Sequence, residues 1–291
     1  MAAVSESNTL RIALPKGRMG PGVLALLADA GVRVHVGSRA YRPTISLPDF
    51  DAKILKPQNI VEMLHLGSRD IGFAGADWVK ELGANVVELL DTGLDPVRLV
   101  AAAPPSLLLD GRLPNRPLVV ATEYERLVKS WLRKRAESVQ VVHSFGATEV
   151  FPPEDADFIV DIAATGSTLA ANGLSVFDEL MSSSTRLYAC PLALESPAKR
   201  AAVGGFVMLL RSVLEARRRV MLEVNVPSDR LESIIEILPC MREPTVSRLH
   251  GQTGCAVKVA LLRDELPVVV PEVKRRGGTD IVVSALCQIV P

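Results

Sequence analysis

The segment from residue 157 to residue 174 limits the fold most strongly. It reads DFIVDIAATGSTLAANGL, and its apolar residues Phe158, Ile159, Val160 and Ile162 are typical of a short buried strand. Small hydroxyl residues around Gly166 follow at once, and the next apolar run starts a helix that ends at Asn172-Gly173. A strand that passes through a tight turn into a helix is the unit of α/β folds with a mostly parallel sheet.

The turn in this segment has the composition of an anion site. Gly166 lets the backbone bend without a Cβ clash, so that several N–H groups can point inward. The helix start adds partial positive charge, and three side chains offer hydroxyl donors: Thr165, Ser167 and Thr168. Asp161, at the end of the strand, is placed to accept hydrogen bonds from a sugar hydroxyl. We predict a ribose-phosphate site; the alternative is an ordinary helix N-cap, a common role of such turns.

The composition excludes several other classes of protein. Lys plus Arg and Asp plus Glu both number 33, so no overall charge favours nucleic acid or an anionic membrane. No apolar run reaches the roughly eighteen residues that span a bilayer, and the N-terminus lacks the pattern of a secretory signal. Four cysteines form no CxxC pair, and four scattered histidines form no HExxH motif. We expect a cytoplasmic protein with free thiols, no catalytic histidine and no nucleic-acid or membrane partner.

Strands and helices alternate on short loops in two successive stretches, which predicts two α/β lobes joined by two crossing segments with a ligand between them. We assign residues 1–102 and 186–218 to lobe I and residues 103–185 to lobe II. A long helix begins at Pro197 and ends in the basic run 217–219. A basic last turn that complements the helix dipole explains this run better than a nucleic-acid patch.

The tail, residues 219–291, changes character and forms a separate domain. Its pattern predicts strands and helices in the order β-α-β-β-α-β, which is the ferredoxin-like arrangement. The expected elements are a strand at 221–227, a helix from Ser228, strands at 245–249 and 255–262, a helix at 271–276 and a strand at 280–286.

Six motifs are similar to those of the ATP phosphoribosyltransferase family, and the resemblance covers nearly the whole chain. They are LRIALPKGRM at residues 10–19, LKPQNI at 55–60, DIGFAGADWV at 70–79, VATEYERL at 120–127, GATEV at 146–150 and D-x-x-x-T-G-x-T-L-x-x-N-G-L at 161–174. The resemblance implies two catalytic lobes of the periplasmic-binding-protein type (type II). The C-terminal domain marks the long form of the family, in which it is the regulatory module for histidine; the short form depends on a separate regulatory subunit. Homodimers that assemble into hexamers are also implied.

The reaction implied by the resemblance condenses ATP with phosphoribosyl diphosphate to N1-(5-phospho-β-D-ribosyl)-ATP and diphosphate, the first step of histidine biosynthesis. Adenine N1 attacks the anomeric carbon as the highly charged diphosphate leaves. Catalysis then depends on positioning and charge neutralisation rather than on a protein nucleophile. Mg²⁺ is the implied metal, since hard oxygen ligands suit it.

The resemblance assigns the 5-phosphate to the turn residues Thr165, Gly166, Ser167 and Thr168, and the ribose hydroxyls to Asp161. Three basic residues follow strand ends and are assigned to diphosphate or to the ATP phosphates: Lys16, Arg18 and Lys56. The alternative for these three is a solvated surface charge. The family commonly has arginine at the position of Lys56; lysine keeps the charge and lacks the planar fork.

Three further residues have open roles at the substrate site. Glu149 holds ribose or Mg²⁺, or else caps a backbone N–H at its turn. Tyr124 lines the nucleotide or packs half-buried. Asp77 contacts adenine or a metal, or else shapes a turn and helix start, the role that the sequence favours.

In the tail, Asn225, Thr245 and Ser284 fall near strand ends and are the predicted contacts for histidine across a subunit interface. The alternative is that these polar residues are merely solvated.

Two other functions remain open. One is a non-catalytic two-lobed protein that binds a small molecule or senses an effector; the other is a phosphoribosyltransferase for a different base. A spectral change of adenine on incubation with both substrates would distinguish the enzyme from a non-catalytic binder. Competition among bases would distinguish it from a transferase for a different base.

Overall fold

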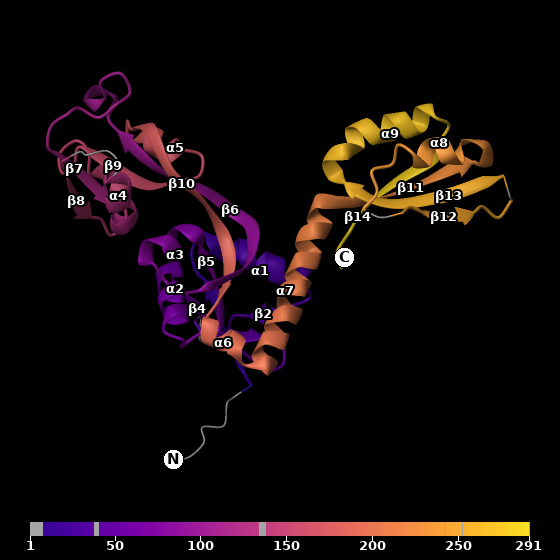
Figure 1. The fold of residues 1–291 in the computed structure, drawn as a ribbon, viewed down its shortest axis with the longest axis horizontal. Coiled ribbons are helices and arrows are strands. Elements are labelled where there is room, and N and C mark those ends of the chain that lie inside the picture. The colour runs from indigo at the N-terminus through magenta and orange to yellow at the C-terminus, as the bar shows by residue number, and fades with distance from the viewer. Residues whose placement is uncertain (1–7, 38–40, 134–137, 242, 252, 291) are drawn as a thin grey trace, which may run out of the picture. The chain divides into compact units, whose positions relative to one another are not determined.

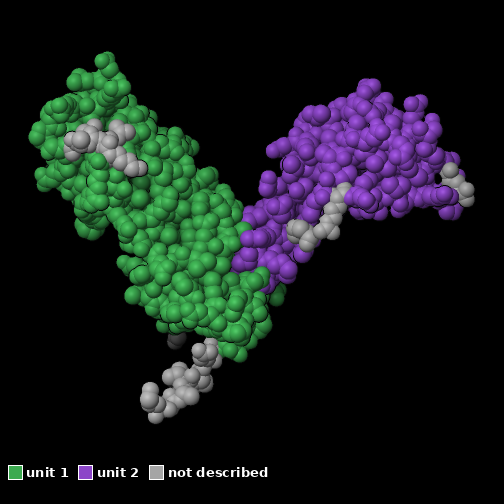
Figure 2. All heavy atoms as spheres, in the orientation of Figure 1, with its two compact units in different colours: residues 1–28, 32–204 green, residues 29–31, 205–291 purple. Residues whose placement is uncertain are grey.

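The computed structural model describes residues 8–37, 41–133, 138–241, 243–251 and 253–290. The chain forms two compact units, residues 1–28 with 32–204 and residues 29–31 with 205–291 (Figure 2). The predicted turn at residues 251–254 falls partly on Gln252, which lies outside the described residues.

An eight-stranded sheet in the order β4-β1-β5-β10-β6-β9-β7-β8 organises the first unit. Its strands are β1 (Leu10–Pro15), β4 (Phe50–Leu55), β5 (Ile71–Gly75), β6 (Val87–Ala103), β7 (Leu118–Thr122), β8 (Val139–His143), β9 (Phe158–Ala163) and β10 (Ser175–Ala189). Strands β4, β1 and β5 pair in parallel, as do β9, β7 and β8. The central pairings of β10 with β5 and β6, and of β6 with β9, are antiparallel. The sheet is therefore mixed rather than mostly parallel.

Strands β6 and β10 are the two crossing segments that the sequence predicted (Figure 1). They pair from Ser175–Ala103 to Ala189–Val87 with several register shifts. In β6 the residues Leu99 and Ala101 pack on one face of the sheet while Val100 and Ala102 pack on the other, so this strand is buried on both sides. The sequence predicted only the end of β10, because residues 175–184 are polar and lack a clear apolar alternation.

Short helices surround this sheet. They are α1 (Met19–Asp29), α2 (Pro57–His65), α3 (Ala76–Leu82), α4 (Glu125–Leu132), α5 (Ser167–Ala171) and α6 (Pro191–Glu195), with the 3₁₀ turns η1 (Pro105–Leu107) and η2 (Thr148–Val150). A small ladder pairs β2 (Val34–His35) with β3 (Thr44–Ile45). Helix α2 illustrates how the local sequence determines where a helix begins and which side is buried. Pro57 occupies its first turn, where a missing N–H costs nothing, and Ile60, Val61 and Leu64 form its buried stripe. Helix α7 (Pro197–Arg218) then leads into the second unit.

The second unit has the predicted ferredoxin-like order. Its elements are β11 (Arg219–Pro227), η3 (Ser228–Arg230), α8 (Leu231–Ile235), β12 (Thr245–Arg248), β13 (Gly254–Leu262), η4 (Arg263–Glu265), α9 (Leu266–Arg275) and β14 (Thr279–Ala285). The antiparallel sheet has the order β12-β13-β11-β14. Alternate residues of β11, such as Leu222 and Val224, form a core with Ile234 of α8 and Val273 of α9. Both helices therefore cover one face of this sheet, and the other face carries the remaining residues of each strand.

Helix α9 begins earlier than the sequence predicted. The prediction placed its start at Pro271, whereas the helix begins at Leu266 and contains Pro271 in its interior. Pro267 occupies the first turn, which is the position where proline is preferred. Two prolines four residues apart made the choice of the start ambiguous, and the apolar run between them, which packs on the sheet, decides it.

No helix in the described residues is both long and apolar enough to cross a membrane. All four cysteines lie in the described part of the chain and are free thiols; Cys190 is buried.

Candidate functional site

A cavity of about 240 Å³ lies at the turn between β9 and α5. Its lining comprises Glu149, Asp161, Ile162, Ala163, Ala164, Thr165, Gly166, Thr168 and Leu169. Gly166 has φ 78° and ψ 2°, a left-handed conformation in which a side chain is strained. A Cβ at Gly166 would meet no atom within 4 Å. Backbone conformation, not lack of space, is therefore what requires glycine at this turn.

The start of α5 carries no side-chain cap. Gly166 itself is the N-cap residue, and no side chain bonds the first turn as a cap. The Thr165 and Ser167 hydroxyl oxygens lie 2.9 Å apart, and the Ser167 N–H donates to the Thr165 hydroxyl at 3.3 Å. The turn thus presents hydroxyl groups and the N–H end of a short helix to the cavity, as an anion site requires. The alternative of an ordinary helix cap applies in part, because the Thr165 hydroxyl accepts from the first N–H of α5.

Two carboxylates also line this cavity. Asp161 lies on β9 and Glu149 on η2. Burial first, and then the nearby charges of Glu123 and Glu149, raise the pKa of the Asp161 carboxyl to about 6, against hydrogen bonds from the Ile162 N–H and the Thr148 hydroxyl. At neutral pH Asp161 is therefore mainly ionised and accepts hydrogen bonds beside the anion turn.

The raised pKa of Asp161 predicts a pH-dependent gain in stability for Asp161→Asn. Because the folded-state pKa of about 6 exceeds the ordinary 3.8, protonation favours the folded state. That stabilisation is complete at low pH and is lost as pH rises through about 6. We expect the variant to be about 1–2 kcal/mol more stable than the parent at pH 8, and about half of that at pH 5. Urea unfolding at both pH values measures this, with Asp155→Asn, an exposed carboxylate, as control. A gain that is the same at both pH values would contradict the prediction.

The basic residues of lobe I meet at one edge of the sheet. Lys16 and Lys56 each follow the last residue of a strand, and the two strands, β1 and β4, are parallel neighbours. The Lys16 ammonium lies 5.4 Å from the ring centroid of Tyr41. The Arg18 guanidinium donates to the backbone oxygen of Asp95 at 3.3 Å. Carboxyl ends of parallel strands are where α/β proteins bind ligands, and here that edge is positively charged.

Asp77 and Tyr124 meet inside the protein. The Tyr124 hydroxyl donates to Asp77 at 2.9 Å, and Ser183 of β10 donates to the other carboxylate oxygen at 2.7 Å. Tyr124 is 2% exposed and Asp77 is 4% exposed, and the Tyr124 ring lies 4.7 Å from that of Trp78. Burial raises the pKa of the Tyr124 hydroxyl, and the Asp77 charge raises it further. These contacts describe the packing role of Tyr124 and a structural role of Asp77 at the start of α3.

Removal of the Tyr124 hydroxyl is expected to destabilise the fold and to leave substrate affinity unchanged. Tyr124→Phe leaves a buried carboxylate of Asp77 with one partner fewer, at a cost of about 1–3 kcal/mol. Urea unfolding measures the cost, and Tyr41→Phe, at an exposed tyrosine, serves as the control. A raised KM for ATP in a variant of unchanged stability would instead show that Tyr124 contacts the nucleotide.

The three predicted effector residues lie on the helix-free face of the second sheet. Asn225 donates to Asp280 at 3.0 Å. Thr245 lines a cavity of about 240 Å³ together with Met221, and Ser284 is the cross-strand neighbour of Met221. The structure thus brings Thr245 and Ser284 toward the same residue, whereas Asn225 lies four residues further along β11.

No group of three or more His, Cys, Asp or Glu side chains is arranged to hold a metal ion within the described residues. Mg²⁺ is usually held by only one or two carboxylates together with substrate phosphates and water. Asp161 and Glu149, the two carboxylates of the cavity, fit that donor set.

Two residues near the site were not predicted from the sequence. Glu123 follows the end of β7, and its charge acts on Asp161; Thr148, in the GATEV motif, hydrogen-bonds Asp161. In the sequence, the only sign of their role is that each lies next to a predicted residue, Tyr124 or Glu149. Their contacts with Asp161 join separate segments of the chain.

Two family models match the chain. The one described as ATP phosphoribosyltransferase matches residues 56–212, which is more than half of the chain. The chain belongs to the ATP phosphoribosyltransferase family. The other, described as HisG, C-terminal domain, matches residues 216–288. The second match corresponds to β11–β14 and therefore places the ferredoxin-like domain within the same family.

Curated members of the ATP phosphoribosyltransferase family align over almost the entire chain. The protein of that name from Pelotomaculum thermopropionicum is 36% identical over 287 residues, which is 97% of this chain and 99% of the relative. The protein from Chlorobium phaeobacteroides is 35% identical over 279 residues, 94% of this chain and 95% of the relative. A solved structure, the ATP phosphoribosyl transferase (HisG:HisZ) complex from Thermotoga maritima, is similar with a TM-score of 0.63 and 26% identity, covering 71% of this chain and 99% of that chain.

Proposed function

We propose that this family member condenses ATP with phosphoribosyl diphosphate to N1-(5-phospho-β-D-ribosyl)-ATP and diphosphate, the first step of histidine biosynthesis. The observation that carries the proposal is the left-handed Gly166 turn, which lines one cavity together with the start of α5 and Asp161. That cavity offers N–H and hydroxyl donors for a phosphate and an acceptor for sugar hydroxyls. Relatives that align over 97% and 94% of this chain carry the name of this activity.

The proposed roles follow from the chemistry of transfer. The turn at residues 165–168 binds the 5-phosphate and fixes the ribose, and Asp161 accepts hydrogen bonds from the ribose hydroxyls. Adenine N1 then attacks the anomeric carbon, the bond from that carbon to diphosphate breaks, and the electron pair leaves with diphosphate. Lys16, Arg18 and Lys56 neutralise phosphate charge at the basic edge of lobe I. No protein nucleophile takes part.

Mg²⁺ is proposed as the metal. When bound with diphosphate, it supplies positive charge to the leaving group. Asp161 and Glu149 would hold it, since carboxylates suit this ion and both line the cavity. A bound cation would relieve the repulsion from Glu149 that helps to raise the pKa of Asp161.

Incubation of the full chain with ATP, phosphoribosyl diphosphate and Mg²⁺ tests the reaction. We expect the ultraviolet absorbance change of N1-substituted adenine, and no change when either substrate is omitted. A protein that binds both substrates without any absorbance change would be the non-catalytic binder. Competition among nucleotides and free bases tests the choice of adenine, because a transferase for another base would be inhibited best by that base.

The second unit is proposed to bind histidine as a feedback inhibitor, with Asn225, Thr245 and Ser284 as contacts between copies of the chain. A helix-free sheet face that carries these polar residues and a small cavity supports this assignment. The chain carries its own C-terminal domain, so we infer that it assembles as a homodimer and hexamer without a second kind of subunit. A cytoplasmic location fits its free thiols. Sedimentation of the purified chain measures the assembly.

Inhibition by histidine predicts reciprocal coupling. If histidine weakens the binding of phosphoribosyl diphosphate about tenfold, phosphoribosyl diphosphate must weaken histidine binding by the same factor. Titration of each ligand by calorimetry, with and without the other, measures both factors. The Thr245→Ala variant should bind histidine more weakly and phosphoribosyl diphosphate normally. Identical affinities in the presence and absence of the other ligand would remove the regulatory role.

A further inference from the structure

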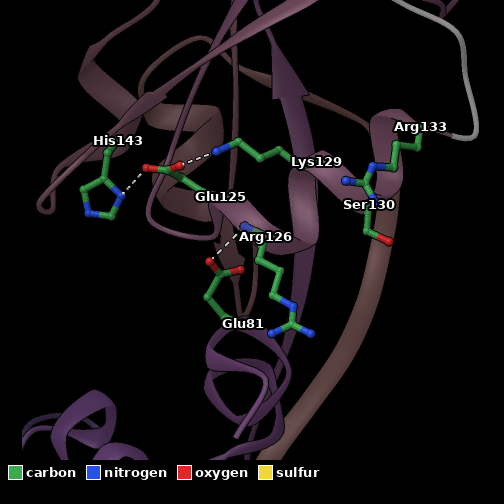
Figure 3. A pocket seen from close by; sticks show the side chains of 7 residues that line it. All are labelled: Glu81, Glu125, Arg126, Lys129, Ser130, Arg133 and His143. Atoms are coloured by element: carbon green, nitrogen blue, oxygen red, sulfur yellow. Dashed lines mark hydrogen bonds and ion pairs between the residues drawn. The ribbon is translucent and has the colours of Figure 1, made fainter.

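A second, larger cavity in the first unit contains none of the residues assigned to the proposed reaction. It has a volume of about 620 Å³ and lies between helices α3 and α4, so we call it the α3–α4 cavity (Figure 3). Its charged and titratable lining comprises Glu81, Glu125, Arg126, Lys129, Arg133 and His143. None of these side chains lines the cavity at the Gly166 turn.

Both carboxylates of the α3–α4 cavity already have partners. Glu81 of α3 accepts hydrogen bonds from the backbone N–H groups of Arg126 and Leu127 at 2.9 and 3.0 Å, so it caps the start of α4 from another helix. Glu125 binds the Lys129 ammonium at 2.7 Å and His143 Nδ1 at 3.2 Å (Figure 3). Both carboxylates of the cavity are therefore already bound to neighbouring groups of the protein.

Two guanidinium groups, those of Arg126 and Arg133, complete the charged lining of the cavity. In the part of the chain that the structure describes, neither Arg126 nor Arg133 forms an ion pair through its side chain. Arg126 lies in the first turn of α4 and Arg133 is its C-cap residue, seven positions later, so they project from the same side of the helix. The Arg126 guanidinium lies against Gly83, the left-handed residue that ends α3, and a Cβ at Gly83 would collide with it. Space for this arginine against α3 is thus provided by a glycine.

An exposed aromatic ring stands beside the same cavity. Phe145 is 93% exposed, and its ring centroid lies 4.5 Å from that of His143, which lines the cavity. The two rings meet edge to face at 69°. Because a fully exposed phenylalanine gains nothing from burial in the folded chain, its ring is available for stacking.

We propose that the α3–α4 cavity binds a nucleotide, with its phosphates on Arg126 and Arg133 and its base stacked on Phe145. Guanidinium groups match phosphate oxygens bidentately, and stacking of a base on an aromatic ring contributes about 1–3 kcal/mol. The volume of about 620 Å³ is of the size that small ligands occupy. A merely solvated helix face would account for the exposed cations, but not for the exposed ring next to His143.

The nucleotide has two possible sources. It is either the ATP that reacts at the Gly166 turn or a second nucleotide that binds elsewhere and acts on the two lobes, since α3 and α4 belong to different predicted lobes. Calorimetric titration of the full chain with ATP, without phosphoribosyl diphosphate, measures affinity and stoichiometry. It needs no turnover, so its outcome is separate from the success or failure of the proposed reaction.

Two variants test the site independently. We expect Arg126→Ser with Arg133→Ser, and separately Phe145→Ala, to weaken ATP binding in the cavity at least tenfold. The matched control, Arg112→Ser with Arg200→Ser, removes two exposed arginines outside the cavity and should change affinity less than twofold. Glu125→Gln removes negative charge from the rim and should tighten binding. Thermal unfolding checks that each variant is folded, and Phe145→Ala removes only an exposed ring.

The source of the nucleotide follows from the same variants. A substrate site predicts one ATP per chain and a raised KM for ATP at unchanged KM for phosphoribosyl diphosphate. A second nucleotide predicts two ATP per chain, of which the variants lose one, with KM for ATP unchanged. Either result supports the proposal. Isotherms of both folded variants that match the parent in affinity and stoichiometry would overturn it.

Discussion

Replacement of Gly166 by valine is expected to weaken the binding of phosphoribosyl diphosphate about 100-fold, or ~2.7 kcal/mol. The residue has φ 78°, where any L side chain is strained and a β-branched one most of all. The surroundings of Gly166 are open, so the variant is free to fold. Relief of the strain moves the turn and its N–H groups away from the position that a phosphate requires. Calorimetric titration with phosphoribosyl diphosphate measures the loss.

Gly173 provides a matched control in the same segment. It has φ 70°, a Cβ there also meets no atom within 4 Å, and it lies after the other end of α5, outside the cavity. Gly173→Val should therefore cost a similar amount of stability and leave the affinity for phosphoribosyl diphosphate within about threefold. Equal losses of affinity in both variants would show that the effect comes from general destabilisation of α5. Normal affinity in a folded Gly166→Val variant would remove the basis of the phosphate site.

Asp161→Asn is expected to lower kcat about 10²–10³-fold while the KM for phosphoribosyl diphosphate changes less. The side chain keeps its shape and loses the negative charge beside the ribose, where positive charge develops as diphosphate leaves. Because the pKa of Asp161 is about 6, the activity of the parent should rise through pH 6 as the carboxylate ionises. The variant should lack this acid limb. Initial rates from pH 5 to pH 8 measure both effects.

The exposed Asp155 offers the control for Asp161. Asp155→Asn makes the same chemical change six residues away and should keep both the rate and the acid limb. Full activity of Asp161→Asn at pH 8 would exclude a role for this charge in the reaction. Combined with the expected gain in stability, a large loss of rate would show that the fold tolerates an unfavourable carboxylate for the sake of catalysis.

The site at the Gly166 turn could be predicted because its determinants are local. Strand, glycine, hydroxyls and helix follow one another within eighteen residues, and the physical demands of an anion act on consecutive backbone groups. The ferredoxin-like domain was predictable for a similar reason: its strands alternate and its turns are short. Here the pattern of burial follows the sequence pattern residue by residue along β11.

Features that depend on distant pairing could not be predicted. The hydrogen bond of Tyr124 to Asp77 joins positions 47 residues apart, and that of Ser183 to Asp77 spans 106 residues. Neither has a local signal, so the sequence left the role of Tyr124 open. The long polar start of β10 is a strand only because β6 offers it a partner along its whole length. The capping of α4 by Glu81 likewise comes from another helix.

The pairing of Ala103 with Ser175 has a consequence for how this chain is put together. The segment 104–174 leaves strands β6 and β10 and returns to them at two adjacent points of one ladder, so its two ends are close together. Insertions with neighbouring ends are the kind that folds tolerate best. Because β7 and β9 share a core with Leu99 and Ala101 of β6, an exchange of this segment between relatives should be tolerated when the facing residues of β6 are exchanged with it.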